Sequence, residues 1–345
     1  MRLGVEAAFV DGALVRGDVA VDDGRISAVG LPPADGGRIA APGFVDLQVN
    51  GFGGIDFTWG DVDGVRSAAA AMARTGVTSF LVTIPSAPAA QYAVALAVAR
   101  AAVAARCGAV GIHLEGPFLS PARAGAHPLD RLVPPSVALV DDWGPVTLLT
   151  MAPELPGGLD VVRALVERGT TVAIGHSDAD AATCHVAYDA GARAHTHVWN
   201  ATPPLTARGG GPAGVALTRP DVAPCFIADL VHVGPETLAL STAAAADRYV
   251  VVTDAVAPAG LGDAGGVRLG DGTIAGSTAT LDASVRNLVE LGRPLPEVLA
   301  AVTSRPAALV GREASLRIGA IADVVVLDDD LTVTTVLRGG RSLET

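Results

Sequence analysis

The sequence has no apolar run long enough to cross a membrane, although half of its residues are hydrophobic. The nearest candidate, Ala93–Ala105, is short, rich in alanine and interrupted by Arg100, which is typical of a packed helix. The first residues, Met1–Glu6, show no basic segment followed by an apolar one, so we expect no signal peptide. These absences favour a cytoplasmic protein with no membrane partner.

Cysteine pairs and basic clusters are also missing. Cys107, Cys184 and Cys225 lie far apart and form no Cys-x-x-Cys pair, which favours reduced, buried thiols over a disulfide framework or a structural zinc site. The formal charge of −12, without any cluster of basic residues, argues against a nucleic-acid partner, because counterion release needs a basic face. An anionic small molecule would need a local basic pocket to overcome the general repulsion.

What the sequence does contain is a repeated alternation of strand and helix. Short apolar runs rich in β-branched residues alternate with helical stretches, several of which end at a glycine suited to a left-handed C-cap. Such runs suit strands that are buried on both faces. Eight are present: Gly43–Val49, Val77–Ile84, Ala109–Leu114, Val146–Met151, Thr171–Ile174, Arg193–Val198, Pro224–Ala228 and Tyr249–Thr253.

Eight strand–helix units in about 250 residues predict an α/β fold of the (β/α)₈ TIM-type barrel class. No Gly-x-Gly-x-x-Gly follows the first strand, which argues against a nucleotide-binding sheet. Both chain ends instead carry short strands and hairpin-like pieces, such as Val19–Val29 and Asp323–Leu327. We expect residues 1–41 and 315–345 to form one small β-sandwich domain beside a barrel domain of residues 42–314.

Polar side chains gather where the predicted strands end, and in such a barrel the active site lies at these ends. Glu115, His176 and His197 offer three metal ligands and leave a position open for water, as a catalytic zinc-type site requires. Asp254, at the end of the last strand, is placed to take a proton from the attacking water and return it to a leaving nitrogen. The sequence therefore predicts a metal-dependent hydrolase that cuts an amide bond.

Other histidines need separate interpretation, because a lone histidine in a strand is more often structural than a ligand. His113 and His185 are interpreted as structural on this ground. Alternation does not separate His195 from His197, since both are expected to face the same side of one strand. His197 is preferred because it is nearer the C-terminal end of that strand.

At these residues the sequence resembles the amidohydrolase superfamily and, within it, the N-acetylglucosamine-6-phosphate deacetylases. The resemblance covers nearly the whole chain, and its most specific motif is His113–Leu119 followed by Gly125–His127. The other matching segments are Ala41–Asp46, Asn50–Gly54, Gly175–Ser177, Thr196–Ala201, Ile227–Asp229, His232–Val233, Val252–Ala255 and Ile321–Val325.

The resemblance implies a barrel with a β-sandwich from both chain ends, assembled as a homodimer. It implies metal ligands at Glu115, His176 and His197 and an acid/base aspartate at Asp254, which agrees with the interpretation of the strand ends. It also implies a carbonyl-contacting histidine at His127, which the strand-end argument does not find because this residue lies on a loop.

The resemblance further implies contacts to the sugar and phosphate from Asn200, Ala201, Arg208 and His232. Arg208 is expected to act across the dimer interface, on the site of the neighbouring subunit. An arginine and a histidine together would form the local basic pocket that an anionic amino-sugar phosphate needs in an acidic protein.

The number of metals follows from the end of the first strand. Many superfamily members carry His-x-His there and bind two metals, whereas this chain has Gln48 and Asn50. Neutral amides are poor ligands beside imidazole, so we expect one divalent metal ion per chain. Zinc is the expected ion, although iron, cobalt and manganese also suit a Glu-His-His site. Gln48 is expected to hydrogen-bond a water on that metal.

Three positions depart from the family pattern. Leu230–Val231 stands where a glycine is usual, Thr202 replaces a usual methionine, and Arg123 alone remains of the basic residues before Gly125–His127. The chemistry should survive these changes, while Leu230 and Thr202 leave the exact sugar open because they are expected near the pocket.

The resemblance predicts hydrolysis of N-acetylglucosamine 6-phosphate to glucosamine 6-phosphate and acetate, in amino-sugar catabolism. The alternatives with the same chemistry are an N-acetylgalactosamine-6-phosphate deacetylase, an N-acyl amino acid deacylase and a cyclic-amide hydrolase. A non-catalytic sugar-phosphate-binding homologue is the alternative from another class. The intact Asp254 argues against it, because a binding protein has no need of that aspartate.

Overall fold

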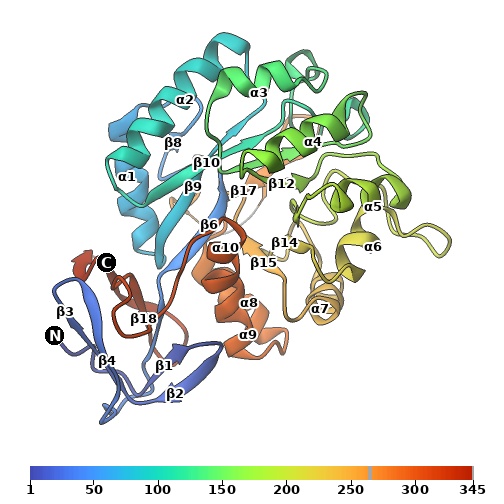
Figure 1. Cartoon of the computed structure of the whole chain (residues 1–345). Coiled ribbons are helices and arrows are strands. Elements are labelled where there is room, and N and C mark those ends of the chain that lie inside the picture. Colours follow the sequence, from blue (N-terminus) through green and yellow to red (C-terminus); the bar gives the residue numbers. More distant parts are fainter. Residues whose placement is uncertain (263–265, 344–345) are drawn as a thin grey trace.

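The computed structural model describes residues 1–262 and 266–343, and a parallel barrel forms its centre (Figure 1). The barrel sheet has eight strands in the order β15-β14-β13-β12-β11-β10-β9-β6, and every neighbouring pair is parallel. Their bounds are β6 (Phe44–Val49), β9 (Val77–Pro85), β10 (Ala109–Glu115), β11 (Leu148–Met151), β12 (Thr171–Ile174), β13 (Ala194–His195), β14 (Ala223–Ile227) and β15 (Val250–Val252).

The barrel closes beyond the ends of its first and last strands. Val49, at the end of β6, forms a parallel bridge with Ala255, and the N–H of Asn50 donates to the carbonyl of Ala255 at 2.7 Å. Closure therefore occurs next to the polar strand ends. The predicted (β/α)₈ TIM-type fold class is confirmed.

The strands separate two apolar cores because successive side chains point to opposite faces. Val45 and Leu47 of β6 and Val250 and Val252 of β15 belong to one buried cluster. Val251, between the last two, belongs to the large cluster that includes residues of the surrounding helices. Burial of both strand faces explains why these segments are continuous apolar runs.

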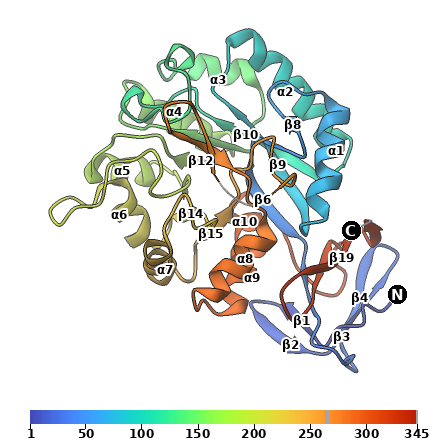
Figure 2. The same cartoon turned by 180° about the vertical axis from the view of Figure 1, so that it is seen from behind.

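Helices surround the barrel on its outside (Figure 2). The first of them begins after Asp61, whose side chain accepts the N–H of Gly64, and the chain leaves it through Gly76 at φ +87. No helix in the described residues is long and apolar enough to cross a membrane. The helices are α1 (Val62–Ala73), α2 (Ala89–Ala104), α3 (Val137–Trp143), α4 (Gly158–Glu167), α5 (Ala181–Asp189), α6 (Gly211–Thr218), α7 (Pro235–Ala244), α8 (Leu281–Glu290), α9 (Leu295–Val302) and α10 (Ser304–Leu309).

The two chain ends meet in a separate sheet beside the barrel, where the blue and red segments of Figure 1 lie together. Its order is β2-β1-β5-β18-β19-β20, and β18 pairs antiparallel with β5. The strands are β1 (Ala7–Val10), β2 (Ala13–Arg16), β5 (Ile39–Pro42), β18 (Val324–Leu327), β19 (Val333–Arg338) and β20 (Arg341–Leu343), with a hairpin of β3 (Asp18–Asp22) and β4 (Arg25–Leu31). The domain boundaries 1–41, 42–314 and 315–345 stay a proposal.

One predicted strand is much shorter than expected. The sequence predicts a strand over Arg193–Val198, whereas β13 contains only Ala194 and His195. The chain turns because His197, Trp199 and Ala201 adopt φ values of 27°, 84° and 50°. The expectation that His195 and His197 share one strand face is therefore wrong, and His197 lies on the turn that follows β13.

Candidate active site

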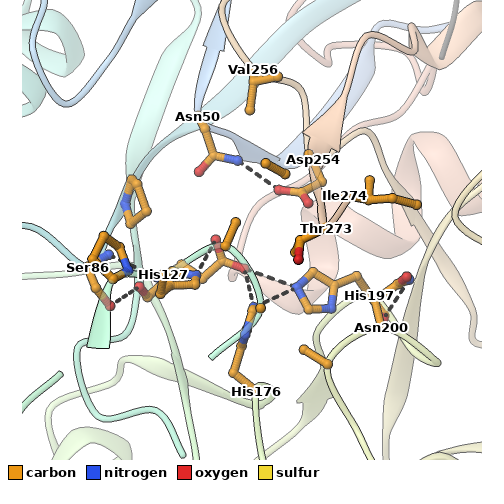
Figure 3. Close-up of a pocket in the computed structure, with 18 of the residues that line it drawn as sticks. Asn50, Ser86, His127, His176, His197, Asn200, Asp254, Val256, Thr273 and Ile274 are labelled. Atoms are coloured by element: carbon orange, nitrogen blue, oxygen red, sulfur yellow. Dashed lines mark hydrogen bonds and ion pairs between the residues drawn. The ribbon is translucent and has the colours of Figure 1, made fainter. Parts of the chain in front are cut away.

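A cavity of about 530 Å³ opens at the C-terminal ends of the barrel strands. Most of the predicted site residues line it, together with Thr273–Gly276 from the short hairpin of β16 (Gly266–Arg268) and β17 (Ile274–Ser277) that follows the last barrel strand. Figure 3 shows this cavity. The predicted residues among its lining are Glu115, His127, His176, His197, Asn200, Ala201, His232 and Asp254.

Three donor atoms form a compact cluster in this cavity. Oε1 of Glu115 lies 3.1 Å from Nε2 of His197 and 3.3 Å from Nε2 of His176, and the two imidazole nitrogens are 3.1 Å apart. All three side chains are buried. In a tetrahedral site with bonds of 2.0–2.1 Å, neighbouring ligand atoms are roughly 3.3 Å apart, so the cluster has the dimensions that a zinc-type ion requires.

Proton positions in the cluster also fit a cation. Nδ1 of His176 lies 3.0 Å from the carbonyl oxygen of Arg123, which only accepts, so Nδ1 carries the proton and Nε2 presents a lone pair. Burial lowers the pKa of His176 to about 4, which keeps it neutral. Burial alone would raise the pKa of Glu115, but its close contacts with the imidazoles of His127, His176 and His197 hold it well below its usual range. An anion and a lone pair therefore converge on one point.

Asp254 lies in the same cavity, on the turn that follows β15 (Figure 3). Its Oδ1 accepts the side-chain amides of Asn50 at 2.7 Å and Gln48 at 3.0 Å. Among residues 1–262 and 266–343, no partner donates a hydrogen bond to its Oδ2, which leaves this oxygen for an incoming ligand or water. Burial and the nearby charge of Glu115 raise the pKa of Asp254 to about 6. Asp254 is thus an ionisable group with one fixed and one available oxygen.

Gln48 contacts two carboxylates of the site. Its amide nitrogen donates to Oε1 of Glu115 at 2.7 Å as well as to Asp254, so it joins the two carboxylates. Asn50 also stands in the expected strand-end segment, but its hydrogen bond to Asp254 depends on how the barrel closes and has no local signal in the sequence.

His127 reaches the cavity from the loop after β10. Its Nδ1 accepts the N–H of Ser86 at 3.3 Å, so its other ring nitrogen carries the proton. This nitrogen, Nε2, lies 3.7 Å from Oε2 of Glu115. An imidazole N–H beside the donor cluster is suited to stabilise negative charge on a substrate oxygen.

His232 lines the cavity with a carboxylate behind it. Asp229 accepts Nδ1 of His232 at 2.6 Å and also accepts the N–H groups of Val231 and His232 at 2.9 Å. Burial would raise the pKa of Asp229, but these hydrogen bonds lower it, so it is ionised. Nε2 of His232 is buried and has no hydrogen-bond partner in the described part of the chain. Asp229 lies two residues after the end of β14, so its place at a strand end was a signal in the sequence that could have found it.

The remaining predicted contacts divide into two groups. Asn200 and Ala201 line the cavity, and the amide of Asn200 donates to the carbonyl of His197 at 3.3 Å. Arg208 lies on an exposed loop and, within the described residues, is not part of the lining of its own chain's cavity. Within the described residues, neither Leu230 nor Thr202 is part of that lining either, so the expectation that they lie at the pocket is not supported.

In the described part of the chain, the cavity lining does not include His113 and His185, which were interpreted as structural, or His195. His113 is buried between the hydroxyl groups of Thr83, at 3.3 Å, and Thr150, at 2.8 Å. His195 lies 3.0 Å from the hydroxyl of Tyr188, and burial lowers its pKa to about 3. His185 is exposed on α5. The preference for His197 over His195 thus agrees with the placement of both residues. The reason for that preference, a position nearer the end of a shared strand, does not hold because His197 lies after the strand.

Comparison with known proteins places these features in a family. The Amidohydrolase family matches residues 39–343. The chain is 37% identical over 343 residues to the N-acetylglucosamine-6-phosphate deacetylase of Rattus norvegicus, covering 89% of this chain and 83% of that protein. It is 32% identical over 373 residues to the N-acetylgalactosamine-6-phosphate deacetylase of Escherichia coli O157:H7, covering 99% and 97%.

A solved structure agrees over the full length. It is a mutant N-acetyl-D-glucosamine-6-phosphate deacetylase from Mycobacterium smegmatis, in complex with N-acetyl-D-glucosamine-6-phosphate. Its TM-score is 0.94 at 33% sequence identity, and the match covers 100% of this chain and 99% of that one. The resemblance inferred from the motifs is confirmed, and the chain belongs to the amidohydrolase family.

Proposed function

We propose that this chain hydrolyses the acetamide of N-acetylglucosamine 6-phosphate to glucosamine 6-phosphate and acetate. The observation that carries the proposal is the meeting, in one cavity, of a buried Glu-His-His cluster and an aspartate with one available oxygen. Relatives that bear this activity in their names match the chain over most of its length.

Each residue of the cavity has a distinct part in this proposal. A divalent metal held by Glu115, His176 and His197 would polarise the acetyl carbonyl and acidify the attacking water. Asp254 accepts the proton of that water on Oδ2 and delivers it to the leaving nitrogen. His127 donates Nε2–H to the acetyl oxygen and so stabilises the negative charge that develops there.

Substrate binding falls to residues away from the reacting bond. His232, fixed by the ionised Asp229, presents Nε2 to the phosphate, and Asn200 and Ala201 contact the sugar. The chain contains no lysine, so arginine and histidine are its only basic side chains. Arg208 is not part of the cavity lining of its own chain in the described residues. It is proposed to reach the phosphate of a substrate bound in the neighbouring subunit of a homodimer.

The direct test is acetate release from N-acetylglucosamine 6-phosphate, with metal content measured on the same preparation. We expect turnover with one divalent ion per chain, zinc being the first candidate, and loss of turnover after chelation. Asp254→Asn should retain the metal and lower kcat by about 10²–10⁴-fold, the usual contribution of a general base. Near-normal kcat in a metal-loaded Asp254→Asn protein would reject this mechanism.

A second substrate is favoured by one comparison. The relative from Escherichia coli O157:H7 named for the galactosamine epimer matches 99% of the chain. Parallel measurement of kcat/KM for both epimers decides between them, and the same sugars without phosphate test whether the anion is required. Equal rates with and without phosphate would point instead to a deacylase with another acyl-amine substrate.

A further inference from the structure

Asp46 is a buried carboxylate that the mechanism above leaves without a part. It lies on β6, and only 1% of its surface is exposed. Its Oδ2 accepts the hydroxyl hydrogen of Thr253 at 2.6 Å, and its Oδ1 accepts the backbone N–H groups of Thr253 and Gln48, each at 3.2 Å. One carboxylate therefore joins the first and last strands of the barrel directly before Asp254.

Thr253 extends this constraint to the backbone on both sides of Asp254. Its hydroxyl oxygen accepts the N–H of Ala255 at 3.1 Å, and its carbonyl accepts the hydroxyl of Ser277 at 2.6 Å. Ser277 also donates its N–H to the carbonyl of Asp254 at 2.9 Å. Asp254 has a φ of 50°, a conformation that a non-glycine residue keeps only where its surroundings fix it.

A second route runs from Asp46 to the side chain of Asp254. Asp46 holds the backbone N–H of Gln48, and the Gln48 amide donates to Oδ1 of Asp254 at 3.0 Å. Together with the amide of Asn50, which is visible in Figure 3, this hydrogen bond leaves Oδ2 as the oxygen that can accept a proton. Asp46 thus constrains both the main chain and the carboxylate of Asp254.

Joining the strands does not by itself account for a carboxylate at this position. Asp46 forms no ion pair with any residue that the structure describes, and burial raises its pKa to about 7, against the effect of its hydrogen bonds with Thr253 and Gln48. A buried carboxylate without a cationic partner costs free energy that a neutral side chain would avoid. The advantage of a carboxylate here is geometric, because its two oxygens accept three hydrogen bonds from two strands.

We propose that Asp46 is a positioning residue for the reaction, which orients Asp254 for proton transfer through Thr253 and Gln48. Asp46 does not line the cavity described here and acts only through these neighbours. The inference rests on the proposed function, in which Asp254 is the base.

The test compares Asp46→Ala, Asp46→Asn and Thr253→Val with the control Asp18→Ala. Asp18, in β3, is also a buried aspartate, and it accepts the backbone N–H groups of Val5 and Val19, away from the cavity. In each full-length protein, kcat, KM, bound metal and Tm are measured. Asp18→Ala is expected to lower Tm and to leave kcat unchanged.

Asp46→Ala is expected to lower kcat by about 100-fold, the cost of misplacing a reacting group by about 1 Å, with metal still bound. KM should change by less than about threefold, because substrate contacts are intact. Asp46→Asn should recover part of kcat, since its amide oxygen still accepts the two N–H groups. Thr253→Val removes one hydroxyl at nearly constant volume and decides the question if Asp46→Ala does not fold.

A crystal structure of Thr253→Val gives a second measurement that does not depend on turnover. We expect Oδ1 of Asp254 to leave the amides of Gln48 and Asn50. If the wild-type protein does not hydrolyse the sugar phosphate, the proposed function fails while this comparison still decides whether Asp254 is held through Thr253. Unchanged kcat in Asp46→Ala, an unmoved Asp254 in Thr253→Val, or equal losses of kcat in Asp46→Ala and Asp18→Ala would overturn the inference.

Discussion

Asp254 is the residue whose ionisation is expected to set the pH dependence of activity. A general base works in its ionised form, and burial together with the charge of Glu115 raises the pKa of Asp254 to about 6. Activity is therefore present above this pKa and lost as pH falls through it. A divalent cation on Glu115 would lower the pKa, so the midpoint of kcat/KM is expected at about pH 6 or below, with about tenfold loss per unit beneath it. A midpoint clearly above pH 7 would contradict the assignment.

The two histidines of the segment after α5 give a matched pair of variants. His197→Gln removes a predicted ligand, so metal affinity should fall by more than the roughly 10–100-fold that loss of an outer partner costs. His195→Gln removes only the contact with Tyr188 and should retain the metal, with a lower Tm. Metal content after gel filtration measures both. Retention of metal by His197→Gln and its loss from His195→Gln would reverse the assignment.

For single residues, the sequence predicts which side chains lie together at the barrel mouth but not which atoms contact each other. Glu115, His176 and Asp254 follow apolar runs, so their convergence at the barrel mouth could be inferred from the fold class alone. His127 lies on a loop whose path depends on tertiary contacts, and only the family resemblance indicated it. The hydrogen bonds of Asp46 cross between the first and last strands, and no local pattern encodes them.

Among the elements, the hairpin of β16 and β17 supplies a test of how closely Asp254 is held. A Cβ at Gly276, which has φ +80, would lie 2.8 Å from the carbonyl oxygen of Asp254 and 2.6 Å from a methyl carbon of Val256. Gly272 has φ +89 and nothing within 4 Å of a Cβ. Gly272→Ala should cost about 1–2 kcal/mol of stability from backbone strain alone, with normal kcat. Gly276→Ala should cost more stability and also lower kcat, because the clash displaces Asp254.

Thermal unfolding and kcat of the two glycine variants decide this prediction. Equal Tm and equal kcat in both would show that the hairpin does not bear on Asp254. The comparison is controlled, since both positions lie in the same turn-and-strand segment and both need a positive φ.

Element prediction succeeds where burial and backbone preference agree. Thr171–Ile174 is a strand at the predicted bounds because it is apolar and enclosed on both faces. A strand is also predicted over Arg193–Val198, yet the chain leaves the sheet after His195. Its turn brings His197 to the donor cluster, and a pattern of residue types does not reveal that a strand ends early at a functional position.

The two ends of the chain pair with each other in the terminal sheet, whereas the first and last barrel strands meet to close the barrel. β5 leads directly into β6, so the terminal sheet and the barrel share a continuous segment. Asp46 lies in β6, four residues after the end of β5. The terminal sheet is therefore joined, through one continuous segment of the chain, to the carboxylate of Asp46.

The part of Arg208 can be tested through the assembly of subunits. Within the described residues, Arg208 is not part of the cavity lining of its own chain. If it serves a neighbouring subunit, Arg208→Ala and Asp254→Asn proteins are each nearly inactive alone. A mixed dimer then contains one site with an intact Asp254 and an arginine from its partner. Mixing the two after subunit exchange should restore about one quarter of wild-type activity, since half of the random dimers carry one good site. No restoration, with exchange verified by mass spectrometry, would place the action of Arg208 within its own subunit or outside catalysis.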